Sequence, residues 1–240
     1  SGGVDSTLVL SLLRKIKPEI GINAISVRFA DSITETNAAA KTAEKFDAEH
    51  HIVNVENYLS ELPKAISMIK MPFWDLHWYH VVKKSQTLSK VLISGDGGDE
   101  LFGGYTFRYK KFLSLTSENS SPLEKANAYL QCHERDRVPD QDKIFNQKSN
   151  FSWESIHSIL LPFFDNQLSR LEQVFLADYN GKLLYNFNPI NSNIIQNFDM
   201  KLLTPILNDE LISISSHIEK SQKYDESNNL GKLPLRTILK

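Results

Sequence analysis

SGDGGDELFGGY occupies residues 94–105 and follows directly on the apolar run KVLI at residues 90–93. The short apolar run is typical of a buried strand, and five of the chain's ten glycines fall in the segment behind it. In open α/β sheets, ligands bind beyond the carboxyl ends of the strands. Asp96, Asp99 and Glu100 would there repel an anionic ligand unless a divalent cation lay between them. The segment therefore predicts a loop that binds an anionic ligand together with a metal ion.

A second glycine-rich loop, SGGVDS at residues 1–6, leads into a predicted helix over residues 6–17. Its glycines permit positive φ and a close approach of the backbone, and the helix N-terminus adds N–H donors and partial positive charge. Its serines add hydroxyl donors, and its aspartate beside a phosphate again requires a cation such as Mg²⁺. The predicted pyrophosphate site comprises Ser1, Gly2, Gly3, Asp5 and Ser6. The alternative is an ordinary helix start that Ser or Asp caps.

Three familiar motifs do not fit these loops. A calcium loop starting at Asp96 would lack the glycine required at its sixth position. A dinucleotide-binding fingerprint starting at Gly95 would meet Glu100 where its third glycine belongs. The sequence also contains no Walker A motif. The loops therefore belong to another kind of phosphate-binding site.

The first part of the chain alternates short apolar strands with helical stretches, which predicts an α/β fold with a parallel sheet covered by helices. We expect strands at 24–29, 51–55 and 90–93, and helices at 6–17, 34–46, 58–68 and 76–88. Beyond Tyr105 the strand signals fade, and we expect a helical lobe broken at 117–122 and 186–193. The predicted division is a core at 1–115 and a helical lobe of the same domain at 116–240.

Composition excludes several classes of protein. The net charge of -2 and a pI near 6.4 provide no broad cationic field, so we expect no binding to nucleic acid. No apolar run is long enough to cross a bilayer, so we expect no membrane association. Cys132 is the only cysteine, which excludes an internal disulfide and agrees with an expected cytoplasmic location.

Together the two loops resemble the PP-loop and the matching signature of N-type ATP pyrophosphatases. Residues 94–105 are similar to the corresponding segment in the C-terminal synthetase domain of glutamine-hydrolysing asparagine synthetases. Weaker similarities follow in the family's order at 26–29, 49–51, 71–75 and 231–236. The resemblance implies an adenine nucleotide alpha hydrolase-like parallel-sheet core with an appended helical C-terminal lobe. It also implies a first strand before Ser1 and further chain beyond Lys240, so we expect an excerpt from a longer enzyme.

The resemblance implies a carbon–nitrogen ligase that uses ATP and Mg²⁺. The β-carboxylate of aspartate would attack the α-phosphorus of ATP, pyrophosphate would leave, and ammonia would displace AMP from the acyl-adenylate. The expected partners are aspartate or another small carboxylate, ammonia from a glutaminase domain, and a second copy of the chain in a homodimer.

The resemblance also implies a role for each loop residue. The backbone of residues 1–6 would hold the β and γ phosphates, while Asp5 and Asp99 would hold Mg²⁺ on the departing pyrophosphate. Asp96 would act as the general base that deprotonates the incoming ammonium or the tetrahedral intermediate. Contacts to the nucleotide are expected from the backbone of Val27 and from Ser94 and Gly95.

The chain departs from the family on the acceptor side. An acidic-x-Arg-x-Pro-Phe-Leu-Asp element is matched here by KLLTPILN at 201–208, which lacks the acid, the arginine and the final aspartate. Upstream, NPINSN at 188–193 stands where a Val-Asp-Arg-like segment would lie. Either the acceptor pocket has changed, or the sequence of the lobe has drifted without a change of function. The alternatives are therefore a related amide synthetase or cyclase with another acceptor, or a nucleotide-binding regulatory module without turnover.

Two histidine pairs and a basic cluster have simpler explanations than ligand binding. His50 and His51 are neighbours on a predicted strand and would point to opposite faces, so we expect structural roles. His77 and His80 have a spacing that could chelate a metal, but the aromatic residues around them favour packing. For Arg108, Lys110 and Lys111, we expect a solvated helix face rather than compensation of phosphate charge.

Overall fold

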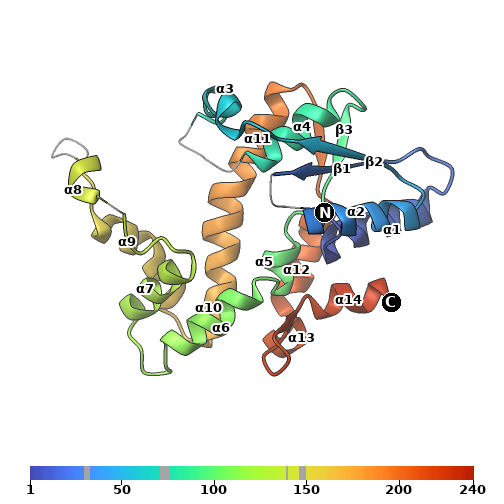
Figure 1. Cartoon of the computed structure of the whole chain (residues 1–240). Coiled ribbons are helices and arrows are strands. Elements are labelled where there is room, and N and C mark those ends of the chain that lie inside the picture. The colour runs from blue at the N-terminus through green and yellow to red at the C-terminus, as the bar shows by residue number, and fades with distance from the viewer. Residues whose placement is uncertain (30–32, 71–75, 139, 146–149) are drawn as a thin grey trace. The chain divides into compact units, whose positions relative to one another are not determined.

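The structure is a computed structural model that describes residues 1–29, 33–70, 76–138, 140–145 and 150–240. Helices dominate it, and short strands pair in between, which confirms the predicted α/β class (Figure 1). The chain forms two compact units that are interleaved in sequence. The first comprises Ser1–Gly98, Tyr185–Ser215 and Pro234–Lys240, and the second comprises Asp99–Leu184 and Ser216–Leu233. These units follow other boundaries than the predicted division at residue 115.

The strands of the first unit form two parallel pairs. β1 (Asn23–Arg28) pairs with β2 (Glu49–Asn54), and Val27 lies opposite Val53. β3 (Val91–Ile93) pairs with β4 (Lys201–Leu203), and Leu92 lies opposite Leu202. The first three strands were predicted, whereas β4 falls in the region expected to be helical. Parallel pairing between segments so distant in sequence explains why local patterns did not reveal β4.

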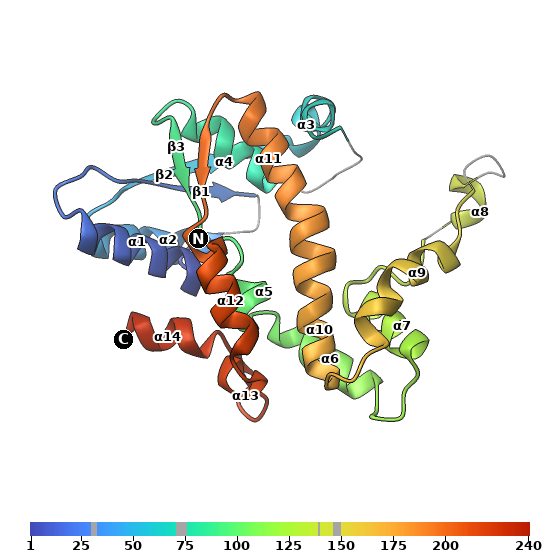
Figure 2. The same cartoon turned by 180° about the vertical axis from the view of Figure 1, so that it is seen from behind.

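Helices cover these strands on two sides. Figures 1 and 2 show α1 (Val4–Ile16) and α2 (Ile33–Lys45) on one side of β1 and β2, with α4 (His77–Ser85) on the other. Arg14, in the last turn of α1, donates from Nε to the carbonyl oxygen of Phe46 (2.9 Å) and from Nη2 to that of Asp47 (2.7 Å). The guanidinium thereby joins the end of α1 to the turn that follows α2.

The main apolar core of the first unit lies among α3 (Leu62–Ile69), α4 and α11 (Asn188–Asn197). The predicted helix over 58–68 is a 3-10 turn, η1 (Tyr58–Glu61), followed directly by α3. The expected break at 186–193 is wrong, because Pro189 stands in the first turn of α11, where its missing N–H costs nothing. Burial contributes roughly 1.5–3 kcal/mol for each large apolar side chain. The buried residues are Ala65, Ile69, Leu76, Tyr79, Val82, Ile190, Ile194, Ile195 and Phe198.

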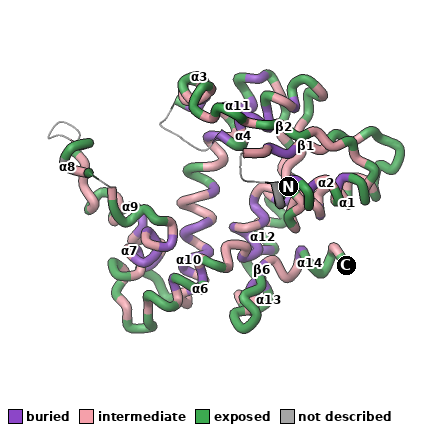
Figure 3. The backbone as a smooth tube through the Cα atoms, viewed as in Figure 1, coloured by how far each residue is buried: buried purple, intermediate pink, exposed green. Residues whose placement is uncertain are grey.

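The second unit is built mainly from helices around an aromatic core, whose buried positions Figure 3 shows along α7 and α10. Its helices are α6 (Thr106–Leu115), α7 (Pro122–Cys132), α8 (Gln141–Ile144), α9 (Trp153–Phe164), α10 (Arg170–Ala177) and α13 (Lys220–Lys223). β5 (Tyr224–Asp225) and β6 (Leu230–Gly231) form a short antiparallel pair. The expected break at 117–122 is observed between α6 and α7. The core side chains include Tyr109, Phe112, Tyr129, Leu160, Phe164, Leu171, Val174, Phe175 and Tyr224.

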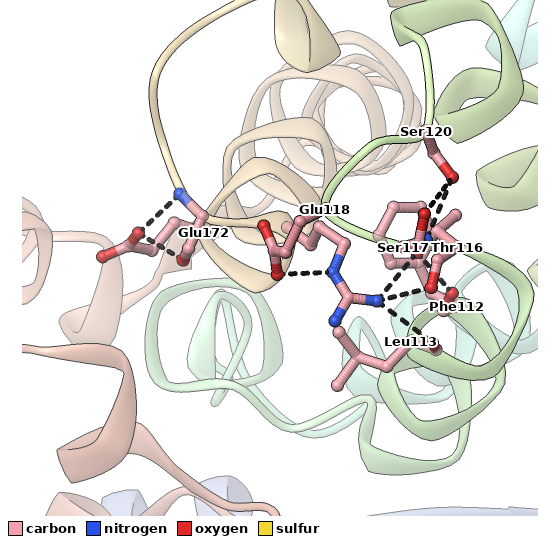
Figure 4. A network of polar contacts seen from close by, with 9 residues as sticks. Phe112, Leu113, Thr116, Ser117, Glu118, Ser120 and Glu172 are labelled. Atoms are coloured by element: carbon pink, nitrogen blue, oxygen red, sulfur yellow. Dashed lines mark hydrogen bonds and ion pairs between the residues drawn. The ribbon is translucent and has the colours of Figure 1, made fainter.

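Polar contacts join the C-terminal end of α6 to α10, and Figure 4 labels Leu113, Thr116 and Glu118 among the residues of this network. Arg170 donates from Nη1 to the carbonyl oxygens of Leu113 (3.1 Å) and Thr116 (2.6 Å), and from Nε to Glu118 (2.9 Å). The last carbonyl groups of a helix have no partner within the helix. The guanidinium supplies partners for two carbonyl groups at this end of α6, and so joins the helix and its following loop to α10.

Four elements span the junctions between the units. They are α5 (Gly98–Phe102), the π-helix η3 (Asp178–Phe187), α12 (Asp209–His217) and α14 (Leu233–Leu239). A 3-10 turn, η4 (Pro205–Leu207), precedes α12. Within the described part of the chain, no helix combines the length and the apolar composition needed to cross a membrane.

Candidate functional site

The loop at residues 1–6 folds back on the start of α1. Ser1 Oγ lies 2.8 Å from Ser6 Oγ and accepts a hydrogen bond from the backbone N–H of Gly3 (3.3 Å). Ser6 Oγ in turn donates to the carbonyl oxygen of Gly3 (3.3 Å). Gly3 is the N-cap residue, and no side chain caps the helix. Ser and Asp therefore do not serve as the helix cap, which was the alternative explanation of this loop.

Gly2 is required by the backbone itself. Its φ is 79°, in the left-handed region that other residues rarely adopt. A Cβ atom at this position would lie 2.9 Å from backbone atoms of Ala38 and Ala39 in α2. The loop therefore needs glycine here both for its turn and for its contact with α2.

The two predicted glycine-rich loops are in contact within the first unit. A Cβ atom on Gly95 would lie 2.8 Å from the carbonyl carbon of Asp5 and 2.9 Å from the backbone nitrogen of Ser6. A Cβ atom on Gly98 would lie 2.3 Å from Cγ of Asp5 and 2.4 Å from its Oδ1. At both glycines, atoms of Asp5 or Ser6 therefore occupy the space that a side chain would need. The loops at residues 1–6 and 94–98 therefore lie against one another.

The Asp5 carboxylate lies in a place suited to a hard cation. It is half-buried at the first turn of α1, against the backbone of Gly98. Magnesium in nucleotide enzymes is typically held by one or two carboxylates plus phosphate oxygens and water. Among the described residues, no group of three or more His, Cys, Asp and Glu could hold a metal ion by itself. The arrangement fits a metal that arrives with a phosphate ligand, rather than a site made only of protein groups.

Asp96 makes one hydrogen bond to α11 and one within its own loop. Asn191, in the first half of α11, donates from Nδ2 to Asp96 Oδ2 (3.1 Å), and the backbone N–H of Asp96 donates to Ser94 Oγ (3.4 Å). Burial raises the pKa of the Asp96 carboxyl, while hydrogen bonds from Ser94 and Asn191 and the charge of His77 oppose that rise. The carboxyl is thus placed to change protonation state closer to neutral pH than a free aspartate would.

The remaining residues that the sequence predicts to contact a nucleotide lie at strand ends. Val27 is buried next to the last residue of β1. Ser94 donates its backbone N–H to the carbonyl oxygen of Leu203 (3.0 Å), which extends the β3–β4 pairing by one residue. Its hydroxyl is directed to Asp96. The contacts of Val27, Ser94 and Gly95 with a nucleotide remain predictions.

Asp99 belongs to the second unit and is engaged there. Its Oδ1 forms an ion pair with Lys232 Nζ at 2.8 Å, beside Gly104. The neighbouring Glu100 is buried, accepts a hydrogen bond from Tyr105 (2.5 Å) and lies 4.0 Å from Lys182. Burial raises the pKa of Glu100. The metal role of Asp99 therefore remains a prediction, and Lys232 is its partner in the described structure.

The segment at 201–208, in which the sequence departs from the family pattern, lies against the second loop within the first unit. Leu203 accepts the hydrogen bond from Ser94, and the side chain of Leu207 covers Gly97, where a Cβ atom would come within 2.2 Å of Leu207 Cδ2. The φ of Gly97 is 92°. The two segments in which the sequence departs from the family, 188–193 and 201–208, thus contact residues 94–97.

Sequence reasoning did not assign functional roles to Asn191 and Leu207. Both belong to segments that were noted only because their sequences differ from the family pattern. Their contacts join positions far apart in the chain, which local sequence patterns do not reveal. The asparagine-rich composition of 188–193 was the one available signal. The segment 71–75, which carries a weaker family similarity, lies outside the described residues.

The histidines and basic residues take mainly structural places. His50 Nε2 lies 3.0 Å from Ser26 Oγ, and His51 Nε2 lies 2.8 Å from Asn23 Oδ1, which agrees with structural roles on β2. His77 is exposed and His80 is buried. Arg108 differs from the prediction of a solvated face, because its guanidinium carbon lies 4.6 Å from the centre of the Tyr105 ring.

Comparisons with known proteins agree with the resemblance. The asparagine synthase family model matches residues 1–240. Glutamine-hydrolyzing asparagine synthetase 1 of Bacillus subtilis (strain 168) is 30% identical over 188 residues, which cover 70% of this chain and 29% of that protein. A putative asparagine synthetase of Mycobacterium bovis is 32% identical over 120 residues, with 48% and 18% covered. The synthetase of Gallus gallus is 32% identical over 124 residues, with 46% and 22% covered.

The chain spans less than a third of the length of these relatives. Its similarity to the synthetase part of such proteins was predicted from residues 1–6 and 94–105. The family model covers both loops and everything between and beyond them. The chain therefore belongs to the asparagine synthase family.

Proposed function

We propose that this chain is the synthetase domain of an enzyme that uses ATP to activate a carboxylate and convert it to an amide. The first candidate acceptor is aspartate, activated as β-aspartyl-AMP. The observation that carries the proposal is the contact of Gly95 with the backbone of Asp5 and Ser6. It joins two loops that each suit part of a nucleotide, and family membership supports the assignment.

The proposed roles of the first loop follow from its backbone. The N–H groups at the start of α1, with no side-chain cap, are suited to donate hydrogen bonds to the β and γ phosphates. The hydroxyls of Ser1 and Ser6 add two donors beside them. Asp5 would hold Mg²⁺, with the same role proposed for Asp99, and the bound metal would neutralise charge on the departing pyrophosphate.

Asp96 is the proposed general base for the step in which ammonia replaces AMP. Its raised pKa brings the carboxyl closer to the working pH, where a general base is most effective. Ammonia would come from a glutaminase domain of the full-length protein or of a partner. We further propose that the enzyme is cytoplasmic and assembles as a homodimer.

A second acceptor class is supported by the position of the 201–208 segment. Leu203 and Asn208 stand where the family has the arginine and the final aspartate, and Lys201 replaces the acid. Because Leu203 is hydrogen-bonded to Ser94, these changes fall beside the nucleotide loop and not on a remote surface. A carboxylate other than aspartate, including a peptide or small-molecule carboxylate that cyclises, is therefore the second candidate substrate.

The decisive experiment gives the full-length protein Mg-ATP, ammonium and either aspartate or a panel of other carboxylic acids. Equal amounts of AMP, pyrophosphate and asparagine would support the first acceptor. Pyrophosphate only with other acids would support the second. Nucleotide binding without pyrophosphate under every acceptor would contradict both, and would leave a regulatory module as the function.

Asp5→Asn tests the metal role. The substitution keeps the size of the side chain but removes the negative charge that would hold Mg²⁺, so we expect pyrophosphate release to fall by at least about a hundredfold. Asp47→Asn, on a turn outside both loops, is the matched control and should leave release unchanged. Equal activity of the Asp5 variant and the wild type would refute the role.

A further inference from the structure

One side chain outside both predicted loops contacts the proposed base. Asn191 Nδ2 donates to Asp96 Oδ2 at 3.1 Å, across 95 positions of the chain. Both residues belong to the first unit, and both side chains are half-buried. A hydrogen bond from an amide to a partly buried carboxylate is stronger than one between neutral groups. The contact is therefore able to fix the carboxylate.

The helix that carries Asn191 is held firmly. Its neighbours Ile190 and Ile194 are 1% and 0% exposed and pack in the apolar core with α3 and α4. Asn193 donates from Nδ2 to the carbonyl oxygen of Ile69 at 3.1 Å, which adds a polar attachment to α3. A functional group works best when its supporting side chains are locked by packing of this kind. Asn191 is thus presented to Asp96 from a rigid element.

The chemistry of asparagine suits a partner of a proton-accepting group. Its side chain carries both a donor and an acceptor, so it can donate to a carboxylate and, after rotation of the amide, accept from a carboxylic acid. Leucine, valine or alanine would offer neither. His77, near the N-terminal end of α4, contributes a charge that opposes the raised pKa of Asp96, and Ser94 contributes a hydrogen bond from the loop itself.

We propose that Asn191 is a positioning residue, which holds the Asp96 carboxylate in one orientation and in its charged form during amide formation. The inference rests on the proposed function, because it assigns a partner to the proposed base. It also gives the unusual 188–193 segment a purpose. In this chain α11 supplies a neutral amide to the base.

The test compares Asn191→Leu with a matched control on the same helix, Asn193→Leu. Each variant exchanges a half-buried asparagine for a side chain of similar volume without a donor, and each loses one hydrogen bond. Only the first loses the bond to Asp96. Asn191→Asp is a third variant, which replaces the donor by a second carboxylate.

The first readout needs no activity. Carboxyl ¹³C NMR titration of the full chain, with Asp96 assigned by comparison with Asp96→Asn, measures the pKa of this carboxyl directly. We expect Asn191→Leu to raise it by about one unit and Asn191→Asp by more, because the charged form loses a donor or gains a like charge. Asn193→Leu should leave it unchanged. An unchanged Asp96 titration in Asn191→Leu would overturn the proposal.

The second readout separates the two half-reactions of the full-length enzyme. We expect Asn191→Leu to lower amide formation by about tenfold or more, while ATP–pyrophosphate exchange, which reports adenylation, stays within about twofold of wild type. Equal losses in the Asn191 and Asn193 variants would mean a merely structural role and would overturn the proposal. If the wild type forms no amide with any acid, the proposed function fails, and the titration still decides whether Asn191 holds Asp96.

Discussion

At the scale of single residues, the site depends on positions where a side chain is absent. Gly95 and Gly98 are needed because Asp5 occupies the space their Cβ atoms would take. Such a requirement is readable from sequence only as an excess of glycine. The structure says which carboxylate each glycine accommodates, and so turns a compositional signal into a specific substitution experiment.

Gly98→Ala should displace the Asp5 carboxylate, because the new Cβ would lie 2.3 Å from Asp5 Cγ. Alanine is otherwise favourable at this helical position, so the fold should tolerate the change. We expect pyrophosphate release to fall by about a hundredfold, the usual effect of a misplacement near 1 Å. Gly21→Ala is the control, since Gly21 is exposed and its Cβ would meet nothing within 4 Å. Full activity of Gly98→Ala would contradict the contact.

Cys132 provides a second residue-scale prediction. Burial raises the pKa of this thiol to about 11, so at pH 8 only about a thousandth of it is the reactive thiolate. We expect Ellman's reagent to modify the native protein very slowly at pH 8 and the urea-unfolded protein quickly. The native rate should rise as pH approaches 11. Rapid native modification at pH 8 would contradict the burial of Cys132.

At the scale of elements, local patterns predicted what local forces determine. The periodicity of residues 6–17 and 34–46 predicted α1 and α2 closely, and short apolar runs predicted β1, β2 and β3. β4 was missed because a three-residue strand exists only through its pairing with β3. α11 was missed because Pro189 and several asparagines look like a break, whereas the packing of Ile190 and Ile194 favours a helix.

The candidate site divides in the same way. Both glycine loops could be predicted, since their chemistry lies in consecutive residues. The contact of Asn191 with Asp96 and the cover of Gly97 by Leu207 could not, since each depends on where α11 and the 201–208 segment return to the first unit. The contacts of segments 188–193 and 201–208 therefore depend on long-range packing, which a single sequence does not reveal.

The attachment of α6 to α10 gives an element-scale prediction. Arg170→Ala should destabilise the protein by about 1–3 kcal/mol, because carbonyl groups at the end of α6 lose a charged donor. Glu118→Gln should cost less than about 1 kcal/mol, because Glu118 is an exposed partner of the same arginine. Urea unfolding followed by circular dichroism measures both. Equal costs would show that the ion pair, and not the carbonyl contacts, carries the stabilisation.

At the scale of the whole molecule, neither compact unit is a continuous stretch of chain. The first unit needs residues 185–215 to complete the β3–β4 pair and the core around Tyr79. A fragment of residues 1–115 should therefore expose apolar surface from α3 and α4. We expect it to bind the dye ANS and to show poorly dispersed amide NMR signals, whereas residues 1–240 should do neither. A well-dispersed spectrum from the fragment would contradict the role of α11 and β4.

The pairing of β3 with β4 has a consequence for how the protein is made. A ribosome releases Val91–Ile93 long before Lys201–Leu203, so the nascent chain carries an unpaired strand edge through the synthesis of about a hundred further residues. The intervening stretch, which makes up most of the second unit, can fold during that interval. Ser216–Leu233, which completes the second unit, follows only after β4. The order of synthesis thus favours helices of the second unit that form early and a β3–β4 pair that closes later. Until then, β3 is a natural target for chaperones and for aggregation.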